Sequence, residues 1–172
     1  MPSMKQWKIY ILSCIYGPLL IVQIVSVFMF GIFYEARFDL VMYAGWVIWA
    51  ISVIFGFLPI FVFKRKGGVA KGKSYVHTKT LVDTGLYSIV RHPQYTAGIL
   101  FSLALILIAQ NWLVLSLGVV IIPLLYIDIV MADKYEIDKF GDEYKRYMER
   151  VPRANFVLGI IRLLSRGNKE RK

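Results

Sequence analysis

Three long stretches without a charged side chain constrain this sequence more than any other feature. Residues 9–34, 40–63 and 93–127 contain no Asp, Glu, Lys or Arg. A helix needs about 20 apolar residues to cross the hydrocarbon core of a bilayer, where it satisfies its own backbone hydrogen bonds. Hydrophobic residues make up 58% of the chain, against roughly 45–50% in soluble domains. The sequence therefore predicts an all-α, polytopic membrane protein with a single membrane-embedded domain over residues 1–172.

The third uncharged stretch is too long for one crossing and just long enough for two short ones. Its most polar point is Gln110-Asn111, which is followed by Trp112, an aromatic residue typical of a membrane–water interface. We therefore predict four transmembrane helices, the last two forming a tight hairpin. Their expected bounds are about 9–34, 40–63, 94–109 and 112–131.

The basic residues predict how the chain is oriented and which partners it meets. The net charge is +10, and most of the Lys and Arg residues fall in the loop 64–92 and in the tail 133–172. Basic clusters beside apolar spans are typical of cytoplasmic loops that face anionic lipid. We expect both termini, this loop and the tail to be cytoplasmic. Membrane lipids are the expected partners, and nucleic acid is not.

The tail is predicted to lie on the cytoplasmic surface of the membrane as two amphipathic helices. The first covers residues 133–153 and the second covers residues 157–164. Apolar or aromatic side chains that recur along one face of a helix suit an interfacial position. In the first helix these side chains are Tyr135, Phe140, Tyr144, Tyr147 and Met148.

The start of the third uncharged stretch reads RHPQY and is unusual for a membrane segment. Pro93 fits the first turn of a helix, whose free N–H groups and partial positive charge favour an anion. Arg91 adds a fixed charge suited to a carboxylate or phosphate, and His92 exchanges a proton near neutral pH. Gly85 and Gly98 allow close backbone approach. These residues predict an anion site at the lipid–water boundary; the alternative is that Arg91 snorkels and His92 caps the helix.

Three carboxylates are further candidates for this site. Asp128 lies near the cytoplasmic end of the fourth predicted span, where an ionisable group either has a function or is shallow enough to reach water. Asp133 and Glu136 are three residues apart and share a helix face. This face either looks into the site or is solvated. One cysteine and two histidines are too few for a structural zinc site, so no metal is expected.

Two segments resemble the integral-membrane methyltransferases of the isoprenylcysteine carboxyl methyltransferase and phospholipid methyltransferase family. LVDTGLYSIVRHPQYTAG (81–98) is similar to the family pattern LV-x-x-G-x-Y-x-x-x-RHP-x-Y. FGDEYKRYMERVPR (140–153) is similar to FG-x-x-Y-x-x-Y-x-x-x-VPR. The resemblance covers roughly residues 75–155. RHP-x-Y alone is a weak motif, whereas both segments in order on either side of a hairpin are fairly specific.

The resemblance implies transfer of a methyl group from S-adenosylmethionine to a lipophilic acceptor, such as a prenylcysteine carboxylate or a phospholipid amine. The cofactor would occupy a cytoplasmic pocket that the acceptor enters from the bilayer. The residues implied to bind the cofactor are Leu81, Val82, Gly85, Tyr87, Arg91, His92, Pro93, Tyr95, Gly98, Tyr144 and Tyr147. The implied catalytic residues are Asp133, Glu136 and Arg153. Where the family usually carries a Glu-Glu pair ahead of the FG, this chain reads Asp133-Lys134.

Two other functions are compatible with the sequence. Sterol-reductase-like proteins carry a similar RHP-containing C-terminal region and bind NADPH, whose phosphates would also suit Arg91 and the basic loop. The other alternative is a non-catalytic membrane scaffold or lipid-binding protein that keeps the same fold. Lys134 and Glu136 are the residues that favour the scaffold.

Overall fold

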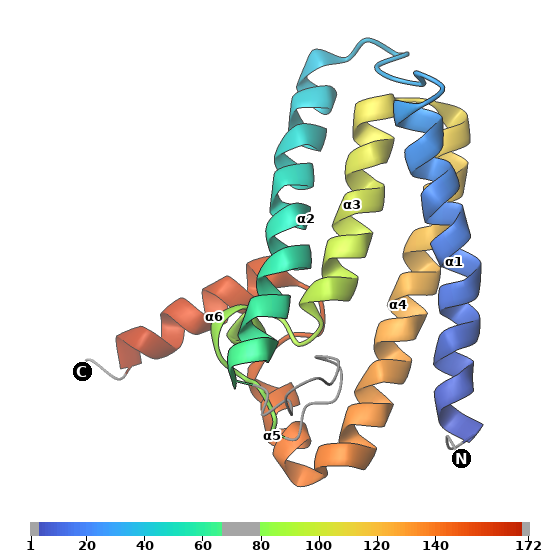
Figure 1. The fold of residues 1–172 in the computed structure, drawn as a ribbon. Coiled ribbons are helices and arrows are strands. Elements are labelled where there is room, and N and C mark those ends of the chain that lie inside the picture. The colour runs from blue at the N-terminus through green and yellow to red at the C-terminus, as the bar shows by residue number, and fades with distance from the viewer. Residues whose placement is uncertain (1–3, 67–79, 170–172) are drawn as a thin grey trace. The chain divides into compact units, whose positions relative to one another are not determined.

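The structure is a computed structural model that describes residues 4–66 and 80–169, and in these two stretches every regular element is a helix (Figure 1). The elements are α1 (Met4–Phe28), α2 (Asp39–Lys66), the 3₁₀ turn η1 (Gly85–Ser88), α3 (Pro93–Ala109), α4 (Trp112–Phe140), α5 (Asp142–Arg150) and α6 (Phe156–Lys169). The all-α prediction is therefore confirmed. Residues 67–79, which belong to the predicted cytoplasmic loop, lie outside the described residues.

Three of these helices contain segments long and apolar enough to cross a membrane. The segments are Ile11–Phe28, Asp39–Val62 and Trp112–Phe140. Their length and composition make the chain an integral membrane protein. α3 is also apolar but has 17 residues, so a fourth span stays a prediction.

The first helix ends earlier than the uncharged stretch suggests. The stretch continues to Tyr34, but α1 ends at Phe28, and Gly31 follows with a φ of +68°. Glycine adopts this left-handed conformation without the strain that a side chain would add. The amide of Ile32 then donates to the carbonyl oxygen of Ser26 at 3.2 Å. A run of apolar residues therefore does not fix where a helix ends.

The predicted helix over residues 133–153 is in fact two helices. α4 continues without interruption to Phe140, and α5 begins at Asp142. The break is Gly141, whose φ of +60° stops the α-helical backbone. Its amide donates to the carbonyl oxygen of Ile137 at 2.8 Å, which closes the last turn of α4.

The helices contribute to two compact units, which are described separately. Unit 1 contains residues 1–54 and 97–132, and unit 2 contains residues 55–96 and 133–172. In unit 1, apolar side chains from α1, α3 and α4 form a buried cluster. Its members are Val27, Leu105, Ala109 and Val114, with Ile24, Ile32, Phe101 and Ile106 packed against them.

Polar side chains of unit 1 hold its helices in register. The Gln23 side-chain amide donates to the carbonyl oxygen of Val114 at 3.0 Å, which joins α1 to α4. α3 and α4 are separated by Gln110 and Asn111, and the Gln110 side chain exchanges two 2.9 Å hydrogen bonds with the backbone of Phe38. In a bilayer such bonds replace water as the partner of polar groups. They fix the connections on this side of unit 1.

Candidate active site

The segment that leads into α3 is folded by a glycine turn in unit 2. Gly85 has a φ of +66° and begins η1, and the Ser88 hydroxyl donates to the Gly85 carbonyl oxygen at 2.7 Å. The turn buries Tyr87 and Val90. A residue with a side chain would be strained at position 85. Arg91 and His92 therefore follow directly after a turn whose residues Tyr87 and Val90 are buried.

Arg91 and His92 lie against the segment that follows α5. The Arg91 amide donates to the Pro152 carbonyl oxygen at 3.1 Å, and the His92 amide donates to the Arg153 carbonyl oxygen at 3.4 Å. The Thr96 hydroxyl in turn donates to the His92 carbonyl oxygen at 2.9 Å. These bonds place the RHP and VPR segments side by side although about 60 residues separate them in the sequence.

The Asp133 carboxylate is the point at which the polar side chains converge. One of its oxygens accepts from the Tyr144 hydroxyl at 2.7 Å and lies 2.7 Å from His92 Nε2. The other accepts from Arg153 Nε at 2.7 Å. The side chain of Asp133 is only 3% exposed. Hydrogen bonds between charged groups are short and about twice as strong as neutral ones, so Asp133 fixes the positions of all three partners.

Arg91 is buried beside the same carboxylate, and not all of its N–H groups have a hydrogen-bond partner among the described residues. Its Nη1 lies 3.3 Å from Asp133 Oδ1, and its side chain is 6% exposed. Within the part of the chain that the structure describes, neither Nε nor Nη1 has a hydrogen-bond partner. A buried donor left in this state is costly. The Arg91 guanidinium therefore has donors available for an anionic group.

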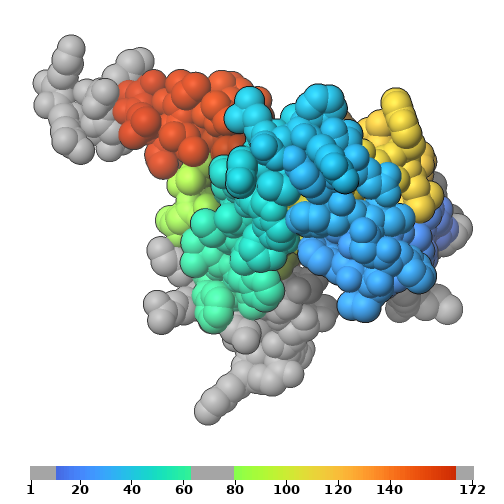
Figure 2. Space-filling view, turned by 90° about the horizontal axis from the view of Figure 1, so that it is seen from above, coloured from blue at the N-terminus to red at the C-terminus, as the bar shows by residue number. Residues whose placement is uncertain are grey.

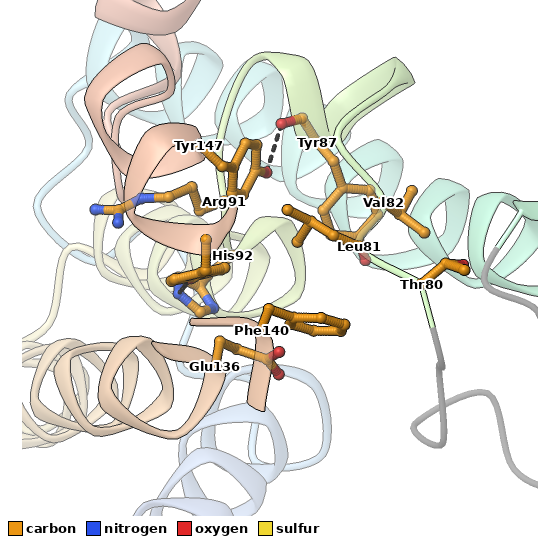
Figure 3. A pocket seen from close by; sticks show the side chains of 10 residues that line it. Thr80, Leu81, Val82, Tyr87, Arg91, His92, Glu136, Phe140 and Tyr147 are labelled. Atoms are coloured by element: carbon orange, nitrogen blue, oxygen red, sulfur yellow. Dashed lines mark hydrogen bonds between the residues drawn. The ribbon is translucent and has the colours of Figure 1, made fainter. Parts of the chain in front are cut away.

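Two tyrosines of α5 close this part of unit 2. The Tyr147 hydroxyl donates to the Tyr87 carbonyl oxygen at 2.6 Å, drawn as the dashed line in Figure 3. The Tyr144 and Tyr147 rings meet edge to face with centroids 5.7 Å apart. Burial, followed by the negative charge of Asp133, raises the pKa of Tyr144, and burial raises the pKa of Tyr147. Both hydroxyls therefore remain protonated donors at physiological pH.

A cavity of about 60 Å³ lies beside these groups. Figure 3 shows His92 and Glu136 on one side of it, Leu81, Val82 and Tyr87 on another, and the Arg91 guanidinium directed away from Leu81 and Val82. The lining residues are Thr80, Leu81, Val82, Tyr87, Arg91, His92, Glu136, Phe140, Tyr144 and Tyr147. An apolar wall with a few convergent polar groups is the usual composition of a small-molecule site. The volume is smaller than the roughly 300–1,000 Å³ of a pocket that takes a whole drug-sized ligand, so it matches one end of such a molecule.

Most of the residues that the sequence pointed to are brought together here. Those that line the cavity are Leu81, Val82, Tyr87, Arg91, His92, Glu136, Tyr144 and Tyr147. Asp133 and Arg153 contact the lining residues through the hydrogen bonds described above. Gly85, Pro93 and Tyr95 shape the backbone next to the site, and the Tyr95 ring lies 6.0 Å from the His92 ring. Gly98 packs on Leu125 in unit 1 and does not line the cavity.

Two lining residues, Thr80 and Phe140, are not among the predicted site residues. The sequence places Phe140 on an apolar helix face and at the start of the FG motif, whereas it does not single out Thr80. Thr80 stands directly before Leu81, the first residue of the other motif. Position in or directly before a motif is thus the signal that identifies them.

Two other polar residues lie away from the cavity. Lys134 is exposed and does not line it, whereas Glu136 does. The second carboxylate at the site is therefore at position 136, and the charge at position 134 faces away from it. Asp128 belongs to unit 1, where it is fully buried and accepts from the Tyr16 hydroxyl at 2.9 Å.

Comparison with known families gives one match to the chain. A family model described as phospholipid methyltransferase matches residues 40–139, which is more than half of the sequence. The matched region begins with α2 and includes the RHP segment, Asp133 and Glu136, and it ends before the FG segment. No curated protein and no solved structure matches the chain.

Proposed function

The chain belongs to the phospholipid methyltransferase family, and on that basis we propose that it transfers a methyl group from S-adenosylmethionine to a lipid at the cavity beside His92 and Glu136. The observation that carries the proposal is the Asp133 cluster. It holds His92, Tyr144 and Arg153 in fixed positions next to an apolar-walled cavity. Such fixed positioning is what methyl transfer requires of a protein, because the reaction depends on aligning two groups.

The chemistry of the lining residues fits the amino-acid end of this cofactor. Arg91 suits its carboxylate, because its Nε has no hydrogen-bond partner among the described residues. Leu81, Val82 and Tyr87 supply apolar contacts. The cavity is the size of one end of the molecule, so these roles concern that end. When bound, the cofactor supplies a methyl group on an already activated sulfonium, and the protein aligns the acceptor and excludes water.

The acceptor that the site favours is a phospholipid amine. Glu136 faces the cavity, so its negative charge would repel a prenylcysteine carboxylate and attract an ammonium headgroup. The ammonium must lose a proton before its nitrogen can attack a methyl group, and Glu136 at the cavity wall can accept that proton. Asp133 acts as a positioning residue, because its oxygens are already occupied by Tyr144, His92 and Arg153.

Calorimetry on the detergent-solubilised protein tests the cofactor assignment. We expect wild type to bind S-adenosylmethionine, and His92→Ala and Arg91→Ala each to bind it at least about tenfold more weakly, the equivalent of one lost charge-assisted hydrogen bond. Lys145→Ala is the matched control, because Lys145 is exposed on α5 and pairs with the nearby Asp142. Absence of binding by wild type, or unchanged binding by both variants, contradicts the proposal. A parallel titration with NADPH tests the reductase alternative, and we expect no binding.

Radiolabelled methyl transfer identifies the acceptor. We expect incorporation into an aminophospholipid and little into a prenylated cysteine, with Glu136→Gln reducing the first reaction. Preferential labelling of the prenylcysteine would overturn the amine assignment and leave the cofactor assignment standing. Robust turnover by wild type would rule out the non-catalytic scaffold.

We also propose a topology of four spans in one membrane-embedded domain, with α3 and α4 as a membrane hairpin. The 17 residues of α3 reach about the lower limit of 17–25 residues for a spanning helix. The basic residues of the loop and tail support a cytoplasmic position for the termini and the site. In a Cys14→Ser background, cysteines at Asn111 and at Lys134 should react with an impermeant thiol reagent from opposite faces of sealed vesicles. Labelling of both from one face would contradict this topology.

A further inference from the structure

We propose that α6 is an interfacial helix that binds the anionic surface of the membrane and thereby holds the segment carrying Arg91 and His92 in place. The first observation is the apolar surface of the helix. Val157, Ile161 and Leu164 follow one another at helical spacing and are 54%, 56% and 65% exposed. In the space-filling view the face of α6 that is turned toward the viewer is uncovered along its described side chains (Figure 2). An apolar stripe of this kind in an integral membrane protein is covered when the helix lies in the headgroup region.

The charges of α6 and of the sequence after it fit an anionic lipid surface. Arg162 is exposed on the helix. The sequence from 162 onward carries Arg162, Arg166, Lys169, Arg171 and Lys172 against the single acid Glu170. Basic residues near an anionic surface each contribute about 1 kcal/mol to its binding.

The depth at which α6 begins agrees with an interfacial position. The Phe156 ring packs against the Phe55 ring of α2 with centroids 5.5 Å apart. Phe55 lies seven residues before Val62, where the apolar span of α2 ends, which corresponds to about 10 Å along the helix. Interfacial helices are buried about 5–10 Å into the boundary between headgroups and acyl chains. α6 therefore starts at the depth that such a helix occupies.

A close contact couples α6 to the site. Gly159 packs directly on the backbone of Ile89, and a Cβ at position 159 would lie 1.9 Å from the Ile89 carbonyl oxygen. Ile89 follows η1 and precedes Arg91 by two residues. A helix held by lipid on one side and by Ile89 on the other restrains this segment. A membrane without anionic lipid releases part of that restraint.

The test uses full-length protein in nanodiscs of phosphatidylcholine alone or mixed with phosphatidylglycerol. In a Cys14→Ser background, a fluorophore on Ile161→Cys is read against quenching by brominated lipids. Leu163→Cys is the matched position, because it lies about 200° around the helix from position 161 and is also exposed. We expect stronger quenching at 161 than at 163, and stronger quenching at 161 when phosphatidylglycerol is present. Hydrogen–deuterium exchange over residues 85–92 should slow in the same nanodiscs.

Two variants separate lipid binding from its effect on the site. Arg162→Gln should lower the ratio of quenched to unquenched label about fivefold, the equivalent of about 1 kcal/mol per basic residue, whereas Lys145→Gln should not change it. Gly159→Ala should keep the quenching at 161 and lose the lipid-dependent slowing of exchange. Equal quenching at 161 and 163, or quenching insensitive to phosphatidylglycerol, overturns the proposal. So does disulfide cross-linking between two Ile161→Cys chains without quenching, because a second copy would then cover α6.

Discussion

At the scale of single residues, Asp133 shows how a buried carboxylate can organise a site. It accepts from Tyr144 and Arg153, and it lies within 2.7 Å of His92 Nε2. These partners come from three separate segments of the sequence, the residue directly before α3, α5 and the segment after α5. Removing the charge therefore affects all three at once, and its cost is larger than that of one hydrogen bond.

Asp133→Asn tests this role. We expect the free energy of unfolding to fall by about 3 kcal/mol, because loss of one partner from a buried ion pair leaves cations uncompensated. The lower end of the usual range applies because the Arg153 side chain is 31% exposed. Thermal unfolding in detergent measures the effect, with Asp138→Asn as the control, since Asp138 is exposed on the same helix. Equal melting temperatures for the two variants would show that the cluster contributes little to stability.

The Tyr144 hydroxyl gives a pH-dependent prediction. Burial and the charge of Asp133 raise its pKa above the ordinary value. A group with a raised folded-state pKa stabilises the fold fully below its unfolded pKa, near 10, and this stabilisation is lost as pH rises further. The difference in melting temperature between wild type and Tyr144→Phe should thus stay constant from about pH 6 to 9. A difference that shrinks across this range would mean that Tyr144 ionises there, against the raised pKa.

At the scale of elements, glycine decides both where helices end and how closely they pack. The sequence correctly predicted helices over the uncharged stretches. A backbone N–H or C=O group without a hydrogen-bond partner is costly in hydrocarbon, and a helix pairs these groups within itself. It did not predict the end of α1 before Gly31 or the break at Gly141, since a glycine also occurs inside helices, as at Gly45 and Gly118. Which glycine turns left-handed depends on contacts that the one-dimensional pattern does not contain.

Gly45 permits the close contact between α2 and α3 in unit 1. A Cβ at this position would lie 2.8 Å from Ile108 Cγ1 and 3.1 Å from the Ile108 backbone nitrogen, which cannot move aside. Gly45→Ala should therefore lower the free energy of unfolding by about 1–3 kcal/mol. Gly17→Ala is the matched control on α1, because nothing lies within 4 Å of its Cβ, and it should be neutral or stabilise by up to about 1 kcal/mol. Similar melting temperatures for both variants would indicate that the contact at Gly45 is loose.

At the scale of the whole molecule, the sequence predicted which residues come together better than it predicted where the helices end. Arg91, His92 and Tyr144 are recognisable from two motifs, and they contact one cavity or one carboxylate as the pairing of the motifs suggested. Lys134 could not be assigned in this way. Its orientation depends on which face of α4 is buried, and the structure leaves it exposed. Lys134, which departs from the family pattern, therefore does not line the cavity.

The two units lead to a last prediction, that stability and ligand binding can be separated along one helix. Asp128 and Asp133 both belong to α4, but Asp128 is bonded to Tyr16 within unit 1, whereas Asp133 belongs to unit 2. Asp128→Asn replaces a carboxyl oxygen by an NH2 group at a fully buried position and disturbs its hydrogen bonding, so the free energy of unfolding should fall by about 1–3 kcal/mol. Effects at sites without shared partners are usually independent. The affinity for S-adenosylmethionine should thus change less than about twofold, while Asp133→Asn weakens it strongly. Calorimetry on both variants at a temperature where each remains folded decides the matter, and an equal loss of affinity in the two would show that Asp128 acts on the site.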